Sequence, residues 1–491
     1  MGSRPTASLS PSARSRRNAL ASIGGGFGAV ALASMLERRV AGDDRLDSID
    51  PIAPLRQRRP DRVGRARSVI VIFLVGGPSQ VDTFDRKPEL DRLDGQPVPQ
   101  PIREAVEKTK FANVFHGAED SLMKSPYRFA QYGESGMWIS ELHPHLAKQV
   151  DRLCFIHSLQ SDSNNHAPSS YQLHTGDIRP GKASLGSWIT YGLGSECENL
   201  PGYVTLFDAG PLGGAANYTN GFLPAAFQPT RLRDRGVPVL DLVPPERFAE
   251  GQGETFDLIG TLDRRFRESH VATGDLDARI ASYELAYRMQ SAALEVGDLA
   301  DEPEYVRREY GIDEPEERLA SFARKCLMAR RLVERGVRFV QLYDMPDKDG
   351  WDAHGALEKN HTPRARWTDR PAAALIEDLH RRGLLDSTLV LWVSEFGRTP
   401  MRQGSDGRQH DAAGFTCWMA GGGVREGVRI GATDEIGLMA VERPAPIRDL
   451  HATMLTAMGT DYESLSYRVA GRDERLTGVA GSARPIDEVF G

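Results

Sequence analysis

Four polar stretches in this chain of 491 residues contain side chains that could hold a metal ion or transfer protons. Residues 344–355 place four carboxylates and His354 in a short segment, and carboxylates and imidazoles are common metal ligands. We take Asp352 and His354 as candidate metal ligands. For Asp347 and Asp349, a solvated acidic turn is the alternative.

A second candidate group lies in residues 394–411. Glu395 ends an apolar run, and a buried carboxylate needs a cation or hydrogen-bond donors beside it. Glu395 and His410, which lies in the polar loop that follows, are therefore candidate metal ligands. Arg398 could pair with Glu395 for purely structural reasons, or it could bind an anionic substrate.

Residues 161–176 form a polar stretch rich in Ser, Asn and His after the apolar run 153–158. A turn from a strand into a helix leaves backbone amides free, and such amides bind anions. A capped helix start with polar surface residues is the alternative. The candidates are His166 and Ser163 for catalysis, and Asn165 and His174 for substrate binding.

Residues 76–85 begin with Gly76 and Gly77, which allow a tight turn of the backbone. Asp82 could face a metal ion, and it is our fifth candidate ligand. It could equally cap the helix that follows.

The elements that position these stretches alternate along the chain. Apolar, β-branched runs that could be buried on both faces indicate strands of a covered, mostly parallel sheet. The alternation of strands and helices predicts a doubly wound α/β fold, with helices on both faces and long insertions. All four stretches should then meet at the carboxyl edge of the sheet. The expected strands are 68–75, 153–158, 203–207, 337–343 and 388–394, and the expected helices are 276–294, 315–335 and 372–383.

The N-terminus has the pattern of an export signal. Arg16 and Arg17 precede a glycine-rich, weakly apolar run, which is typical of the twin-arginine route. We therefore expect a periplasmic or extracellular protein, with the twin-arginine translocase as a partner and no membrane span in the mature chain. An uncleaved anchor and a chance Arg pair are the alternatives. The expected boundaries are a signal at 1–42, a linker at 43–66, one α/β domain at 67–480 and a tail at 481–491.

Composition sets limits on the partners. The net charge is -7, and no basic block follows the N-terminus, which argues against nucleic acid as the main partner. The spacing of the four cysteines matches no zinc motif. Buried free thiols are the expected state, with one disulfide as the alternative.

Several motifs together resemble the large bacterial family catalogued as domain of unknown function 1501, over residues 67–470. That family is grouped with the alkaline-phosphatase/sulfatase-like superfamily, so the resemblance implies an alkaline-phosphatase-like fold and no particular substrate. The motifs are G-G-P-S-Q-V-D-T-F-D at 76–85, W-D-A-H-G at 351–355, S-E-F-G-R-T-P at 394–400, G-R-Q-H at 407–410 and D-L-H-A-T at 449–453.

Two positions depart from the superfamily pattern. Sulfatases carry C-x-P-S-R, followed by T-G ten residues after the cysteine, and here His166 stands where that nucleophilic cysteine would be. His166 could then be a metal ligand, a general base or a phosphorylated nucleophile. Metal-binding relatives carry S-D-H-G where this chain has residues 394–397, so that Phe396 replaces a ligand.

The expected function is metal-dependent hydrolysis of phosphate or sulfate esters, with a small anionic ester or a sulfated glycan as substrate. Mixed carboxylate and imidazole ligands suit Zn or Mn better than Ca. The alternative is a non-catalytic relative that binds an anionic glycan or a surface partner through the same pocket.

Overall fold

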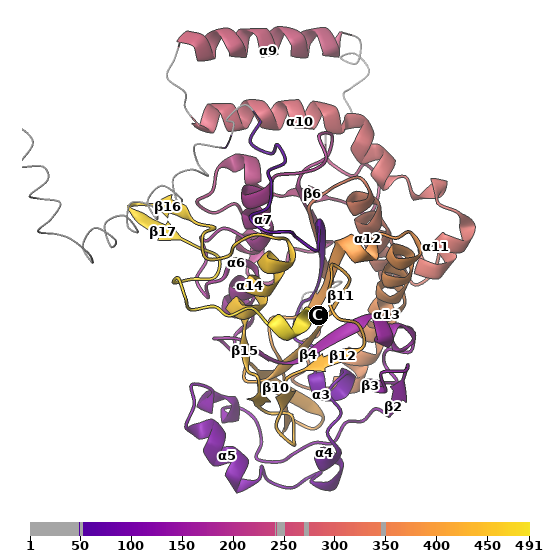
Figure 1. Cartoon of the computed structure of the whole chain (residues 1–491). Coiled ribbons are helices and arrows are strands. Elements are labelled where there is room, and N and C mark those ends of the chain that lie inside the picture. The colour runs from indigo at the N-terminus through magenta and orange to yellow at the C-terminus, as the bar shows by residue number, and fades with distance from the viewer. Residues whose placement is uncertain (1–48, 50–52, 241, 243–250, 270–273, 345–349) are drawn as a thin grey trace, which may run out of the picture. The chain divides into compact units, whose positions relative to one another are not determined.

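A mostly parallel, nine-stranded sheet forms the centre of the chain in its described part (Figure 1). The strand order is β12 (Val428–Ile430), β4 (Leu153–Gln160), β11 (Phe415–Ala420), β8 (Thr388–Val393), β1 (Ser68–Leu74), β7 (Phe339–Asp344), β5 (Tyr203–Leu206) and β6 (Thr230–Leu232), and β15 (Ala445–Pro446) pairs with β4. Within this sheet β11 is antiparallel to its neighbours β4 and β8, and the other pairings are parallel.

The five predicted strands are confirmed, and all of them belong to this one sheet. β1 is buried along its whole length, as its continuous apolar sequence predicts for a strand covered on both faces. It pairs with β7 and β8, so it lies in the middle of the sheet. The one unexpected neighbour is β11, which lies between β4 and β8.

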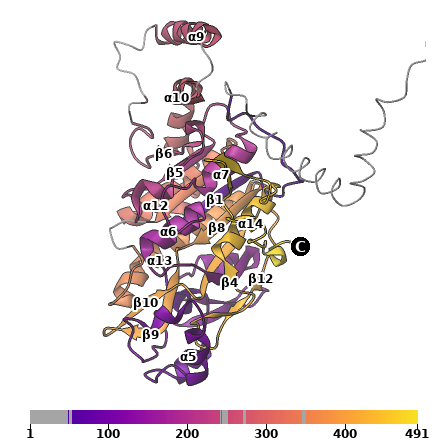
Figure 2. The ribbon, with the colours of Figure 1, turned by 90° about the vertical axis from the view of Figure 1, so that its left-hand side faces the viewer.

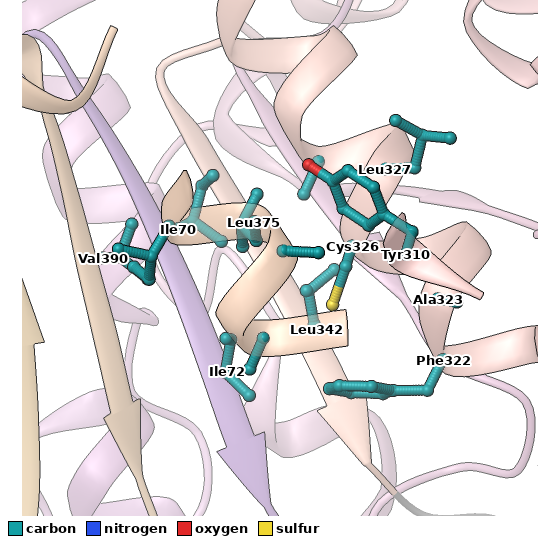
Figure 3. Packing of buried hydrophobic residues seen from close by; sticks show 14 of the residues in the cluster. Ile70, Ile72, Tyr310, Phe322, Ala323, Cys326, Leu327, Leu342, Leu375 and Val390 are labelled. Atoms are coloured by element: carbon teal, nitrogen blue, oxygen red, sulfur yellow. The ribbon is translucent and has the colours of Figure 1, made fainter. Parts of the chain in front are cut away.

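Helices cover both faces of the sheet, which confirms the doubly wound α/β class (Figure 2). On one face Ile70 and Ile72 pack in the same apolar cluster as α12 (Glu317–Glu334) and α13 (Leu357–Arg381), with Leu375 close by (Figure 3). On the other face Val71 lies beside residues of α6 (His166–Thr175), α7 (Leu185–Leu193) and α14 (Ile447–Ala457). Successive side chains of a strand point to opposite faces, and β1 follows this rule.

The predicted helices are present with different bounds. Helix α10 (Gly274–Gly297) and α12 extend over the predicted ranges to within a few residues. The third is much longer than predicted, because α13 begins at Leu357 and continues through Pro363 and Pro371. Its buried face, which includes Leu375, packs on the sheet and holds the helix together despite the two prolines.

The insertions carry the remaining elements. The helices are α3 (Gln80–Thr83), α4 (Pro88–Arg92), α5 (Gln100–Glu107), α9 (Gln252–Ser269) and α11 (Glu304–Tyr310). Two-stranded pairs are formed by β2 (Phe129–Tyr132) with β3 (Met137–Ser140), β9 (Gly397–Gln403) with β10 (Gly407–Asp411), β13 (Ala432–Thr433) with β14 (Ala440–Glu442), and β16 (Tyr467–Val469) with β17 (Arg472–Glu474).

The computed structural model describes residue 49 and residues 53–240, 242, 251–269, 274–344 and 350–491. The predicted signal at 1–42 lies outside these residues. The packed unit is wider than the predicted domain at both ends. Arg58 and Arg65 of the predicted linker donate backbone hydrogen bonds to Leu193 and Ala457, and Val489 of the predicted tail is fully buried.

Two further properties concern the helices and the cysteines. Within the described residues, no helix combines the length and the apolar character that crossing a membrane requires. The four cysteines are free thiols, and Cys154, Cys326 and Cys417 are buried.

Candidate functional site

Loops that follow four parallel strands converge at the carboxyl edge of the sheet, where ligands of open α/β sheets usually bind. A hairpin of β9 and β10 lies beside them and contributes two more residues. The contributing residues are Gly76 after β1, His166 at the start of α6 after β4, Asp352 beyond β7, Glu395 after β8, and Arg398 and His410 on the hairpin.

Asp352 is the centre of this group. One of its oxygens, Oδ1, lies 3.2 Å from His410 Nε2, 3.1 Å from His354 Nε2 and 2.6 Å from the Arg398 guanidinium. The other, Oδ2, lies 3.2 Å from His166 Nε2. Burial would raise the pKa of Asp352, but the neighbouring imidazoles and Arg398 outweigh it and hold the pKa well below the ordinary value. Asp352 is therefore a carboxylate at neutral pH.

The orientation of His410 leaves a lone pair facing this carboxylate. Its Nδ1 lies 2.7 Å from the carbonyl oxygen of Asn164, which can only accept, so Nδ1 carries the hydrogen. Burial lowers the pKa of His410 to about 4, so the ring is neutral at pH 7 and its Nε2 has no hydrogen. Two acceptors, Nε2 and Asp352 Oδ1, then lie 3.2 Å apart. A cation between them would turn this repulsion into attraction.

His166 presents its Nε2 in the same way. Its Nδ1 lies 2.7 Å from Glu395 Oε1, whereas Nε2 is buried and makes no hydrogen bond to the described residues. Burial would lower the pKa of His166, but the carboxylates of Asp352 and Glu395 outweigh it and raise the pKa to about 9. Without a metal the ring is therefore an imidazolium, and a metal ion would replace the proton on Nε2.

The residues present fit a divalent metal ion. One ligand atom from each of His166, Asp352 and His410 lies within 4.8 Å of the others. In both histidines the second ring nitrogen faces a fixed acceptor, Glu395 or the Asn164 carbonyl, and metal-ligating histidines are usually oriented in this way. The arrangement can hold an ion through two imidazoles and one carboxylate.

Glu395 orients His166 and is not positioned as a further ligand. Its side chain is 1% exposed, and Oε1 accepts both the Gly76 amide, at 2.9 Å, and the His166 ring. The second oxygen, Oε2, accepts the Ser394 hydroxyl at 2.8 Å. Burial would raise the pKa of Glu395, but the contacts with His166 lower it below the ordinary value. The carboxylate is thus already satisfied by its own neighbours.

Arg398 is not positioned to bind substrate, contrary to the sequence prediction, because its side chain is fully buried. The guanidinium donates to the carbonyls of Gly77, at 2.8 Å, Gly76 and Arg408, at 3.2 Å, and to Asp352. It is therefore a fixed positive charge that holds Asp352 in place. Arg398 pairs with Asp352 and not with Glu395, which pairs with His166.

Asp82 lies outside the group, which corrects its prediction as a metal ligand. Both Asp82 and Arg408 are fully buried, and the guanidinium of Arg408 donates to both carboxylate oxygens, at 2.6 and 3.1 Å. The Ser79 hydroxyl adds a third hydrogen bond, at 2.5 Å. Because these donors occupy the carboxylate, it serves the structure of the loop after β1.

The remaining predicted residues lie around or outside the group. His354 lies at the rim, 41% exposed, with Nδ1 2.5 Å from Gln403 Oε1. The Ser163 hydroxyl accepts the amide of Asn165, and Asn165 itself is an exposed N-cap residue of α6. His174 is buried, stacks against Tyr343 and meets Phe73 edge-to-face, so it has no surface that a substrate could reach.

Two features of the site were not predicted from the sequence. Gln403 accepts from His354, and only the pairing of β9 with β10 brings it close. Phe396, the residue that departs from the superfamily pattern, is fully buried, with ring centroids 4.8 Å from His166 and 4.5 Å from His410. Its ring fixes both imidazoles by packing.

Comparison with solved structures gives distant similarity. A sulfatase from Pseudoalteromonas sp. is 14% identical with a TM-score of 0.34, and the match covers 86% of this chain and 72% of that one. A phosphonate monoester hydrolase from Silicibacter pomeroyi is 12% identical with a TM-score of 0.31, covering 83% and 76%. An alkaline phosphatase from the Antarctic bacterium TAB5 is 10% identical with a TM-score of 0.28, and the match covers 77% of this chain and 97% of that one.

The family assignment rests on sequence. None of the curated proteins compared with the chain matches it. A family model described as a protein of unknown function, DUF1501, matches residues 66–490, which is most of the chain. The match includes all four polar stretches and the whole central sheet. The chain therefore belongs to the DUF1501 family, as its motifs indicated.

Proposed function

We propose that this protein is a metal-dependent hydrolase of phosphate or sulfate esters, with one metal ion held by His166, Asp352 and His410. The observation that carries the proposal is that two imidazole Nε2 atoms face the Asp352 carboxylate. The Nε2 of His410 has no hydrogen to share with it, and the Nε2 of His166 would exchange its proton for the ion. Such an arrangement is unfavourable in an empty site and favourable around a cation.

Zinc is the ion that this ligand set suits best. Two imidazoles, one carboxylate and an open fourth position make up a common catalytic zinc site, whereas calcium and magnesium prefer oxygen ligands. Asp352 is 24% exposed, so the open position can be reached from solvent. When bound, the ion would polarise an ester oxygen and lower the pKa of a bound water.

The protein's own residues supply orientation and proton transfer. Glu395 and the Asn164 carbonyl fix the ring orientations of His166 and His410, and Arg398 fixes Asp352. His354 is the exposed imidazole of the group and lies next to Asp352, so it is placed to give a proton to a leaving alcohol. Its ring is oriented by Gln403.

The ester class comes from the motif resemblance and from the chemistry of the site. The described part of the site contains no aligned side-chain nucleophile, since the Ser163 hydroxyl has no base beside it among the described residues and His166 is held by Glu395. We therefore assign the attack to water. Of the three roles left open for His166, we therefore propose that of a metal ligand.

A second candidate is a binding module that has lost catalysis. It is favoured by Phe396, which fills the position of a metal-binding histidine in superfamily relatives with an apolar ring. In that case the same group would bind an anionic glycan or a surface partner.

Hydrolysis of 4-nitrophenyl phosphate and 4-nitrophenyl sulfate by the zinc-loaded chain distinguishes the hydrolase from the binding module. The hydrolase proposal predicts release of nitrophenol that falls by about 10²–10⁴-fold in His354→Gln, the usual range for losing a general acid. His380→Gln, at an exposed position near the end of α13, is the matched control and should keep full activity. Zinc binding without hydrolysis of either ester would favour the binding module.

We also propose that the protein is exported by the twin-arginine route to the periplasm or beyond. The support is the order of Arg16, Arg17 and the glycine-rich run in the sequence. That route carries folded proteins, which agrees with a metal centre assembled before export.

A further inference from the structure

A cavity of about 860 Å³ lies in the described part of the chain, and residues of β4 and β12 are among those that line it. These two strands lie at one edge of the central sheet (Figure 1). Its walls come from the segment after α3, from β3 and from the loop before β12. None of its lining residues belongs to the candidate metal centre. The volume falls in the range of small-molecule sites.

The walls of this cavity are basic although the whole chain is acidic. Five basic side chains line it against three acidic ones, whereas the chain has a net charge of -7. The basic residues are Arg86, Lys87, Arg425, Arg429 and Arg443, and the acidic ones are Asp85, Glu442 and Glu488.

Two of the acidic side chains are already neutralised. Asp85 pairs with Lys87 at 3.0 Å and accepts the Thr433 hydroxyl at 2.5 Å. Glu488 pairs with Arg443 at 3.3 Å. Arg86 also pairs with Asp91, at 3.8 Å, so the positive charge that remains is carried by Arg425 and Arg429, against the carboxylate of Glu442.

Two guanidiniums beside β12 are available to a ligand. Arg429 is exposed and has no hydrogen-bond or ion-pair partner among the described residues. The side chain of Arg425 donates a single long hydrogen bond within the described chain, 3.5 Å to the carbonyl of Glu488. A guanidinium binds phosphate, sulfate and carboxylate groups through paired hydrogen bonds.

An imidazole on the cavity wall has one ring nitrogen without a hydrogen-bond partner in the described chain. His157 is 6% exposed and lines the cavity, and its Nδ1 lies 3.0 Å from the Thr416 hydroxyl. Its Nε2 has no partner among the described residues. The ring stacks on Phe155 with an interplanar angle of 4° and a centroid distance of 5.8 Å. Burial lowers its pKa to about 4, so at neutral pH this nitrogen can bond a ligand hydroxyl without adding charge.

An aromatic wall completes the cavity. Trp138 of β3 lines it, with the Arg86 guanidinium 4.4 Å from the ring centroid. Such a wall favours a ligand with an organic body over a bare ion. The cavity thus offers free guanidiniums, one neutral imidazole and an aromatic surface.

We propose that this cavity binds a small organic polyanion, a hydroxylated molecule with two or more oxyanion groups, at a site separate from the metal centre. Arg425 and Arg429 bind the oxyanions, and His157 bonds a hydroxyl of the organic body. The proposal does not rest on the proposed hydrolase, because it shares no residue with that site.

Titration calorimetry of the full chain in the presence of a chelator tests this. The probes are glucose 1,6-bisphosphate, inorganic pyrophosphate and glucose, and the chelator prevents anion binding through a metal ion. We expect the bisphosphate to bind more tightly than pyrophosphate and glucose not to bind. Binding should weaken as salt is added, because exposed charge pairs are screened.

Variants locate the site. Arg429→Gln and Arg425→Gln should each weaken bisphosphate binding by about tenfold, the effect of losing about 1.4 kcal/mol. Arg472→Gln, an exposed arginine of β17 outside the cavity, is the control and should bind as the wild type does. Arg429 has no partner in the described chain, so its variant should fold normally.

The proposal is overturned by any of three results. These are no binding of the bisphosphate at millimolar concentration, equal binding of bisphosphate and pyrophosphate, and binding that is unchanged in Arg429→Gln but lost in His410→Ala. The last would place the ligand at the metal centre.

Discussion

Replacing Arg408 by methionine should destabilise the fold strongly. The change leaves the fully buried Asp82 carboxylate without the guanidinium that donates to both its oxygens, at 2.6 and 3.1 Å. Removing one partner of a buried ion pair costs about 3–5 kcal/mol, because the remaining charge is uncompensated. Arg408 also donates to the carbonyl of Pro400 at 3.0 Å, so the loss should lie toward the upper end.

The double variant Asp82→Asn/Arg408→Met removes both charges. It should be less destabilised than the sum of the two single variants, by at least about 1 kcal/mol, because contacting residues are coupled. Burial would raise the pKa of Asp82, but Arg408 outweighs it and holds the pKa below the ordinary value. The pair's stabilisation is therefore complete at pH 7 and is lost only when the pH falls through that lowered value.

Urea unfolding of the four proteins at pH 7, followed by tryptophan fluorescence, measures this coupling. Bound zinc, measured on the same samples while folded, should be unchanged in Asp82→Asn. A loss of less than about 1 kcal/mol in Arg408→Met would refute the reasoning, as would additive effects. Loss of zinc from a stable Asp82→Asn variant would return Asp82 to the ligand set.

Three further outcomes are expected. The pKa of buried His174 is lowered to about 4, so stability should fall as the pH drops from about 6.5 to 4, and His174→Asn should lessen that fall in thermal melts. Gly77→Ala should destabilise the protein by about 1–3 kcal/mol, the usual cost of a strained backbone, because φ is +76° and a Cβ would lie 2.9 Å from the Phe396 ring. A thermal melt unchanged from wild type would contradict this. Replacing Arg16 and Arg17 by Lys should retain the protein in the cytoplasm, and unchanged periplasmic fractionation would remove the signal assignment.

The strands were predictable because each is a continuous apolar run in a covered sheet. β1 and β8 each end within one residue of the predicted bound, because the apolar run that marks a buried strand lies within the strand's own residues. The start of α13 was not predictable, because Pro363 and Pro371 oppose a helix locally. Packing of its apolar face on the sheet decides the outcome.

The convergence of the polar stretches followed from the topology, but the partner of each side chain did not. Asp82 and Arg408 are 326 residues apart, and nothing local distinguishes this carboxylate from a ligand. Arg398 is close to Glu395 in sequence, yet its guanidinium bonds Asp352, since the loop after β1 holds it by two carbonyls. Tertiary structure alone decides such pairings.

The zinc content of the purified chain tests the central claim most directly. Elemental analysis after growth in metal-replete medium should find about one zinc per wild-type chain and per His380→Ala chain. Zinc should be absent from His410→Ala, and its affinity should fall about 10–100-fold in Glu395→Gln, which weakens the orientation of His166. A wild-type chain that binds no divalent metal, or a His410→Ala chain that binds as much as the wild type, would contradict the metal centre.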